Sequence, residues 1–197
     1  MIIEFGQGDM MDKELIETLI QFADPHELAG LNEICRFSNL KKSDVIELLK
    51  DYKTLYTTDK GLWTIFGKGN EIDNWTCLHV GSSRDIKFEL KGILKLMVSR
   101  SEKLRKSTIF HKNVYELWTY MDKASVKYRS MYNLCEEFVV YEIDVPTYLK
   151  STDAEEYSNV EYAEVKFAYE TKALYWNPAP KMNGNREQEL LTNLISK

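Results

Sequence analysis

The spacing of apolar positions in the first part of the chain is mostly helical. The clearest case places Val45, Leu48, Leu49 and Tyr52 at i, i+3, i+4 and i+7, which is one face of a helix. Two more helices are predicted before it, and Asp12 can cap the first of them. Their apolar residues are Leu15, Ile16, Leu19, Ile20 and Phe22 for the first, and Leu31, Ile34, Cys35 and Phe37 for the second.

Strand-like runs follow in the middle of the chain. Residues 54–58 and 62–66 flank a turn, and residues 75–80 form a third strand after a polar, glycine-containing loop at 67–74. Gly81-Ser82-Ser83 ends this strand, and Ser83 or Asp85 can cap the next helix. The buried face predicted for that helix consists of Ile86, Leu90, Ile93, Leu94 and Met97.

The last third of the chain mixes both patterns. A central strand is predicted at 138–145, where Pro146 stops it, and the alternation at 163–169 indicates another strand. Helical spacing predicts helices at 113–134 and 186–195. The expected class is α+β, with a small, mainly antiparallel sheet flanked by helices.

Three helices followed by a strand hairpin resemble a winged helix-turn-helix. This resemblance implies a helical module at 1–60, whose hairpin extends to 66 in one interpretation, and an α+β domain at 61–197. Its third helix would be the recognition helix, which begins with Lys41, Lys42 and Ser43 but continues with acidic residues. Binding to DNA and binding to protein both stay open for this module.

Charge is distributed unevenly along the chain, which has a net charge of −5. Residues 84–129 carry 12 basic and 5 acidic side chains, a net charge of +7, whereas both flanking regions carry −6. A basic middle indicates an anionic partner, and a solvated pair of lysine-rich helices is the alternative. No apolar run is long enough to span a membrane, and the N-terminus lacks the features of a signal peptide, so we expect a cytoplasmic protein with no membrane partner. The three widely spaced cysteines are expected to be buried, reduced thiols.

The unit from Leu62 to Met97 resembles the GIY-YIG nuclease family, which has a Gly-Ile-Tyr strand, a loop, a Tyr-Ile-Gly strand and a helix. Here the two motifs are Gly61-Leu62-Trp63 and His79-Val80-Gly81, and the second continues as Ser82-Ser83-Arg84-Asp85-Ile86. The chain departs from the family at three positions, because tryptophan and histidine replace the two tyrosines, and Glu89 stands where the family has an arginine.

The resemblance implies a metal-dependent DNA endonuclease that hydrolyses phosphodiester bonds with Mg²⁺ or Mn²⁺. The family places a central strand next and then a helix with one metal-binding glutamate, which Glu187 matches in order. Histidine titrates near neutral pH, so His79 would be the general base, and Arg84 would bind the phosphate or the transition-state charge. DNA would contact the basic residues Lys87, Lys91, Arg100, Lys103, Arg105 and Lys106.

Two other functions stay open. The first is a winged-helix regulator that binds DNA or protein without cleaving either. The second is a protein that keeps the nuclease scaffold without its active site and acts by binding a protein partner or a second copy of itself. Each candidate residue also has a purely structural interpretation, such as core packing for Trp63 and a solvated charge for Glu187.

Overall fold

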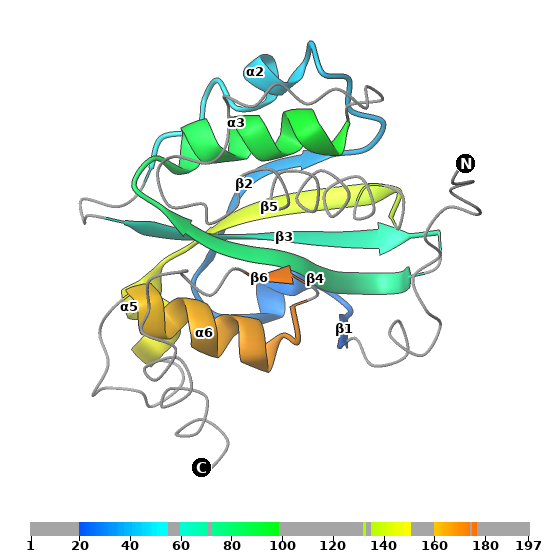
Figure 1. The fold of residues 1–197 in the computed structure, drawn as a ribbon. Coiled ribbons are helices and arrows are strands. Elements are labelled where there is room, and N and C mark those ends of the chain that lie inside the picture. Colours follow the sequence, from blue (N-terminus) through cyan, green and yellow to red (C-terminus); the bar gives the residue numbers. More distant parts are fainter. Residues whose placement is uncertain are drawn as a thin grey trace, which may run out of the picture.

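A single β-sheet with helices on both faces forms the centre of the protein (Figure 1). The computed structural model describes residues 20–54, 60–70, 72–98, 132, 135–150, 160–173, 175 and 176. The strands are β1 (Gln21–Phe22), β2 (Leu31–Phe37), β3 (Gly61–Gly69), β4 (Ile72–Ser83), β5 (Glu137–Ile143) and β6 (Tyr175–Trp176). The helices are the 3₁₀ turn η1 (Pro25–Glu27), α2 (Val45–Leu48), α3 (Ile86–Met97), α5 (Val145–Lys150) and α6 (Val160–Glu170).

The sheet is mainly antiparallel, with strand order β1-β4-β3-β5-β2. The short strand β6 also pairs with β4, in parallel. The predicted α+β class and the antiparallel sheet are therefore confirmed for the described residues. β2 and β5 are hydrogen-bonded neighbours, so the sheet contains strands from both sides of the domain boundary predicted at residue 60.

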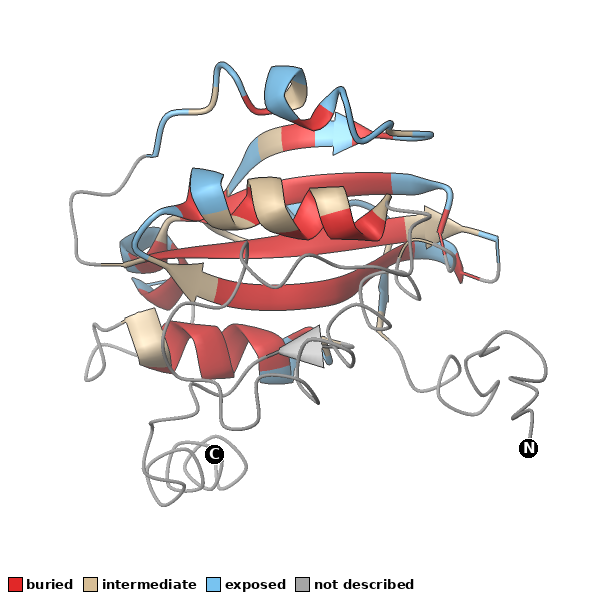
Figure 2. Cartoon of the chain, turned by 45° about the horizontal axis from the view of Figure 1, so that its top comes forward, coloured by how far each residue is buried: buried red, intermediate tan, exposed pale blue. Residues whose placement is uncertain are grey.

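Each face of the sheet carries its own apolar core. Helix α3 covers one face, where Leu90, Ile93 and Leu94 pack with Trp63 and Ile65 of β3. Helices α5 and α6 cover the other face, where they pack with residues such as Leu62 and Phe66 of the same strand. β3 is therefore buried on both faces over most of its length, as the burial colours show (Figure 2).

The predicted strand–strand–helix unit is present, but its long loop is not. β3 continues to Gly69 and β4 starts at Ile72, so only Asn70 and Glu71 connect them. Positive φ angles at Gly69 (102°) and Asn70 (52°) allow this tight turn, since these residue types tolerate the left-handed region. The predicted cap of α3 is confirmed, because the Asp85 side chain accepts a hydrogen bond from the Phe88 N–H at 2.9 Å.

The prediction of a helix around Leu31 was wrong, because residues 31–37 form strand β2. The pairing of β2 with β5 shifts register between Glu33 and Cys35, which leaves Ile34 without an opposite residue. This bulge breaks the two-residue alternation and makes the apolar spacing look helical. The third predicted helix is also shorter than its apolar pattern, since α2 ends at Leu48.

The strand predicted at 163–169 was also wrong, because these residues belong to helix α6. Every residue from 162 to 168 is buried, including Glu164 and Lys166. Both charged side chains have partners, Ser82 for Glu164 and Glu170 for Lys166. The alternation of apolar and charged residues therefore does not reflect alternating burial.

Two remaining predictions concern composition. All three cysteines are buried and free, as predicted. Burial raises the pKa of Cys35 and Cys135 to about 12, so these thiols stay protonated and are poor metal ligands at neutral pH. None of the helices among the described residues has the length and apolar character needed to cross a membrane.

Gly81 has a packing role that leads to a testable prediction. A Cβ atom at this position would lie 2.5 Å from Cζ2 of Trp63, whose ring is fully buried. We expect Gly81→Ala to lower the free energy of unfolding by about 1–3 kcal/mol, the usual cost of overpacking. In a Trp63→Phe background, which removes the clashing ring atoms, the same change should cost clearly less. Urea denaturation of the four proteins measures this coupling, and equal costs in both backgrounds would contradict it.

Candidate functional site

The candidate site lies where β3 begins and β4 ends. Gly61 pairs with Ser83, and Leu62 pairs with Ser82. Directly opposite residues of an antiparallel pair place their side chains on the same face of the sheet. Leu62 packs in the core beneath α6, so Ser82 also points toward that helix.

Glu164 of α6 meets Ser82 at this end of the sheet. Ser82 Oγ donates a hydrogen bond to Glu164 Oε2 at 2.6 Å. Only 7% of Glu164 is exposed, so its carboxylate is held inside the protein near Gly81-Ser82-Ser83 at the end of β4. The two residues are 82 positions apart in sequence, and their contact links α6 to the start of the motif before α3.

Burial is the main reason why the pKa of Glu164 rises to about 7 from its ordinary value of 4.5. The hydrogen bond from Ser82 and the charge of Lys60 oppose this rise, whereas the carboxylates of Glu89 and Glu161 add to it. The local cation therefore compensates only part of the negative charge. A buried carboxyl group that titrates near neutral pH is typical of functional sites.

Two basic residues lie at the same end of the β3–β4 pair as the Ser82–Glu164 contact. Lys60 immediately precedes β3, and its Nζ lies 3.9 Å from Glu161 Oε1, one turn before Glu164 on α6. Arg84 is exposed and follows Ser83 directly, before α3 begins. Because Gly61 and Ser83 are paired, Lys60 and Arg84 both adjoin the same end of the β3–β4 ladder. The structure therefore brings a buried acid, a hydroxyl and two cations to one end of the sheet.

His79 lies elsewhere. It pairs with Ile65, which packs in the core beneath α3, so its ring is on the face of the sheet opposite to Glu164. Only 2% of His79 is exposed, and its ring meets the Trp63 ring edge-on, with 4.9 Å between centroids. The structure thus brings His79 and Trp63 together, but it does not bring His79 to the Ser82–Glu164 pair.

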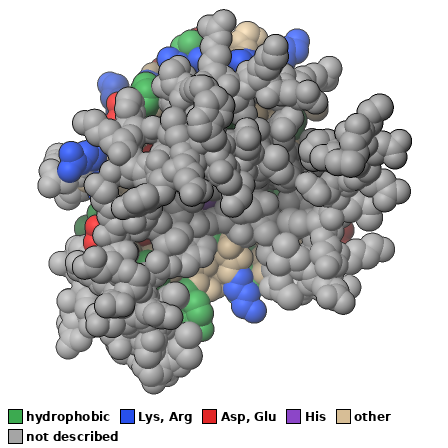
Figure 3. Space-filling model, viewed as in Figure 1, with side chains coloured by type: hydrophobic (Ala, Val, Ile, Leu, Met, Phe, Trp, Pro, Cys, Tyr) green, Lys and Arg blue, Asp and Glu red, His purple; other side chains and the backbone are tan. Residues whose placement is uncertain are grey.

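The predicted basic residues are described only in part. Lys87 is exposed, and its Nζ donates hydrogen bonds to the main-chain oxygens of Lys50 (2.9 Å) and Tyr52 (3.3 Å), so it holds the segment after α2 against α3. Lys91 is half-buried on the same helix. Lysine and arginine side chains are visible at the top of the molecule, near α2 (Figure 3). The other predicted residues, Arg100, Lys103, Arg105, Lys106 and Glu187, lie outside the described residues.

The side chains at this end of the sheet suit a hard cation only if the ion needs very few protein ligands. Within the part of the chain that the structure describes, no group of three or more His, Cys, Asp or Glu residues is arranged to hold a metal ion. Mg²⁺ needs fewer protein ligands, since it keeps several waters and often binds through one or two carboxylates. The negative charge of Glu164 is only partly offset by Lys60, and the carboxylate lies beside the Ser82 hydroxyl, so this pair is compatible with such an ion.

The sequence does not point to Glu164, because the alternation at 163–169 predicts a strand. The resemblance implies a glutamate on a helix, which the sequence pattern places at Glu187. The one available signal was a glutamate in an otherwise apolar stretch after the central strand. This glutamate can be connected to the Gly81-Ser82-Ser83 segment only through the three-dimensional contact with Ser82.

The raised pKa of Glu164 predicts how stability depends on pH. Because the folded state holds this proton more tightly than the unfolded state, its contribution is full below about pH 4.5 and is lost as pH rises through about 7. A shift of this size corresponds to roughly 3 kcal/mol. Glu164→Gln should remove this loss. Urea denaturation between about pH 4 and pH 8 measures it. Glu161→Gln on the same helix removes only a neighbouring charge that makes a minor contribution to the raised Glu164 pKa, so it should keep most of the fall. A Glu164→Gln protein that shows the same fall as the unmodified chain would contradict the prediction.

Comparisons with known proteins find no matching family model, no matching curated protein and no matching solved structure.

Proposed function

We propose that this protein is a divergent, metal-dependent DNA endonuclease in which Glu164 is the central carboxylate. The observation that carries the proposal is the buried Glu164 side chain, which accepts a hydrogen bond from Ser82 at the end of β4. Its titration near neutral pH, beside Lys60 and Arg84, supports a chemical role rather than a purely structural one.

The order of elements supports the same proposal. The resemblance to GIY-YIG nucleases implies two paired strands, a helix, a central strand and then a helix with one glutamate. The chain has β3, β4, α3 and β5 in this order, and β5 pairs with β3 inside the sheet. Among the described helices after β5, α6 carries a buried glutamate that faces the β3–β4 pair. Glu164 therefore replaces Glu187 as the proposed metal ligand.

The chemistry assigned to each residue follows from its position. Glu164 would hold one Mg²⁺ or Mn²⁺ ion, with the Ser82 hydroxyl beside it. The bound ion would neutralise charge that develops on the phosphate oxygens during hydrolysis. Lys60 and Arg84 would bind the phosphates on either side, and the net charge of +7 over residues 84–129 would attract the DNA backbone.

His79 has no direct part in this proposal, because it lies on the other face of the sheet. Its contact with Trp63 indicates that it helps to pack strand β4, and Ser82 of the same strand points to the opposite face of the sheet.

A second candidate is a protein that has kept this scaffold without the nuclease site and acts through a protein partner. This candidate is favoured by the two residues that stand where the family has its signature tyrosines. Trp63 and His79 are 0% and 2% exposed and pack against each other. The third candidate, a winged-helix regulator, is less well supported, since residues 31–37 form a sheet strand instead of its second helix.

The decisive experiment is cleavage of supercoiled plasmid DNA with Mg²⁺ or Mn²⁺. Glu164→Gln should reduce the rate by on the order of 10²-fold or more, because glutamine keeps the size and the contact with Ser82 but supplies no negative charge for the metal. Glu161→Gln is the matched control and should retain most of the activity.

The same assay includes Glu187→Ala, which separates the two glutamate assignments. Loss of activity in Glu187→Ala together with full activity in Glu164→Gln would move the site to the C-terminal segment. If the unmodified chain leaves DNA intact in both metals while remaining folded, the nuclease proposal fails and the scaffold candidate takes its place.

A further inference from the structure

Strand β2 lies at the end of the described sheet. It pairs with β5 on one side, and no described strand pairs with its other side. A free strand edge presents N–H and C=O groups that can pair with another strand. β2 has seven residues, enough to extend over roughly 23 Å of ladder.

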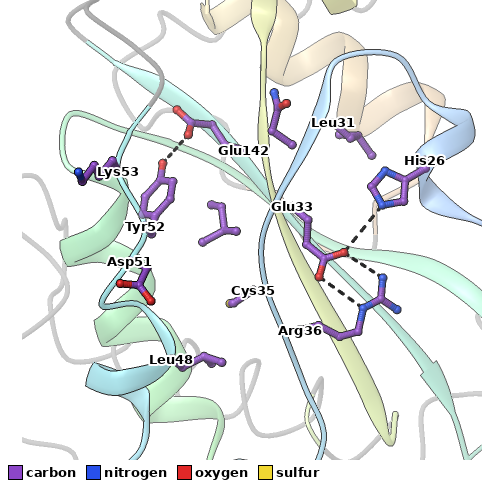
Figure 4. Close-up of a pocket in the computed structure, with 12 residues that line it drawn as sticks. His26, Leu31, Glu33, Cys35, Arg36, Leu48, Asp51, Tyr52, Lys53 and Glu142 are labelled. Atoms are coloured by element: carbon purple, nitrogen blue, oxygen red, sulfur yellow. Dashed lines mark hydrogen bonds and ion pairs between the residues drawn. The ribbon is translucent and has the colours of Figure 1, made fainter.

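An open groove of about 770 Å³ follows this edge (Figure 4). Residues Asp51, Tyr52 and Lys53 form its wall on one side, and Cys35 of β2 and Glu142 of β5 are among the residues that line it. The Tyr52 hydroxyl donates a hydrogen bond to Glu142 Oε2 at 2.7 Å, which fixes this wall to the sheet. The groove leaves room beside β2 for an incoming chain.

Two opposite charges mark the exposed face of β2. Glu33 and Arg36 are both exposed, and Arg36 Nη2 donates a hydrogen bond to Glu33 Oε2 at 3.0 Å. Glu33 pairs with Tyr141 and Arg36 pairs with Val139, and both of those residues belong to the core beneath α6. Despite their three-residue spacing, Glu33 and Arg36 therefore share one face, because the bulge at Ile34 lies between them.

We propose that β2 pairs antiparallel with the β2 strand of a second copy of this chain, which joins two sheets into one. An antiparallel two-fold pair centred between Ile34 and Cys35 places Glu33 opposite Arg36 of the partner subunit. Twofold symmetry repeats the contact, so one register forms two cross-strand ion pairs.

The same charges reject other registers. A shift of three residues in one direction places the two copies of Glu33 opposite each other, and the same shift in the other direction does so for Arg36. Like charges directly opposite each other destabilise an antiparallel pair. Charges and bulges on an edge strand also discourage pairing with unrelated strands. The pattern that protects this edge from general aggregation is thus complementary to itself, which favours a second copy over a foreign peptide.

Charge reversal gives a direct test by sedimentation velocity of the full chain. The unmodified protein should show a concentration-dependent dimer. In Glu33→Arg, both cross-strand positions pair arginine with arginine. In Arg36→Glu, both pair glutamate with glutamate. Each variant alone should therefore dimerise about tenfold more weakly or worse. Mixing the two variants restores both opposite-charge pairs and should restore the dimer. Asp73→Arg, a charge reversal at an exposed residue of β4, which β3 and β5 separate from β2, is the control and should dimerise like the unmodified chain.

Circular dichroism spectra and urea denaturation of each variant check its folding, and the internal Glu33–Arg36 pair is exposed enough that its loss should cost little. An unmodified chain that stays monomeric at all concentrations would overturn the proposal, and would leave the edge for a foreign strand or for none. Single variants that dimerise normally, or a mixture that stays monomeric, would overturn it equally.

Discussion

The position of β3 between β4 and β5 is the constraint on which the rest of the structure depends. The strand is hydrogen-bonded along both edges and buried on both faces. Each of its side chains must therefore fit one of two cores. Trp63 packs against Gly81 and His79 beneath α3, whereas Leu62 lies opposite Ser82 beneath α6. A change on one face can consequently shift the strand that positions the other.

This arrangement gives Gly81, Trp63 and His79 a structural explanation. Gly81 is required because a larger residue would meet the buried Trp63 ring. Trp63 and His79 act as a packed pair, so neither needs a catalytic role to account for its presence. Ser82 points to the other face, where its hydroxyl donates a hydrogen bond to the titratable Glu164. In the proposed nuclease site the relevant residue of this segment would therefore be Ser82, which points away from Trp63.

Local sequence patterns predict an element correctly where the buried residues of the segment repeat with the period of that helix or strand. Helix α3 was predicted with its cap, because Asp85 stands before an apolar face of ordinary helical spacing. Strands β3, β4 and β5 were predicted because apolar residues dominate them. Prediction failed where distant contacts decided the outcome. The bulge at Ile34 depends on pairing with β5, and the burial of Glu164 depends on Ser82, 82 residues earlier. A buried carboxylate has no local signature in the sequence.

The two proposals concern different parts of one sheet, and their geometry makes them compatible. Ser82 lies on β4, whereas the pairing edge is β2, with β3 and β5 between them. An antiparallel pair of β2 strands has its two-fold axis perpendicular to the sheet, so each face of one copy continues into the same face of the other. Both Glu164 sites would therefore lie on the same side of the joined sheet. A dimer of this kind could present its two carboxylates to the two strands of one DNA duplex, whereas a monomer would cut one strand at a time. The ratio of linear to nicked plasmid, compared between the unmodified chain and Glu33→Arg, connects the two proposals: it should fall in the variant while the rate of nicking per chain is maintained.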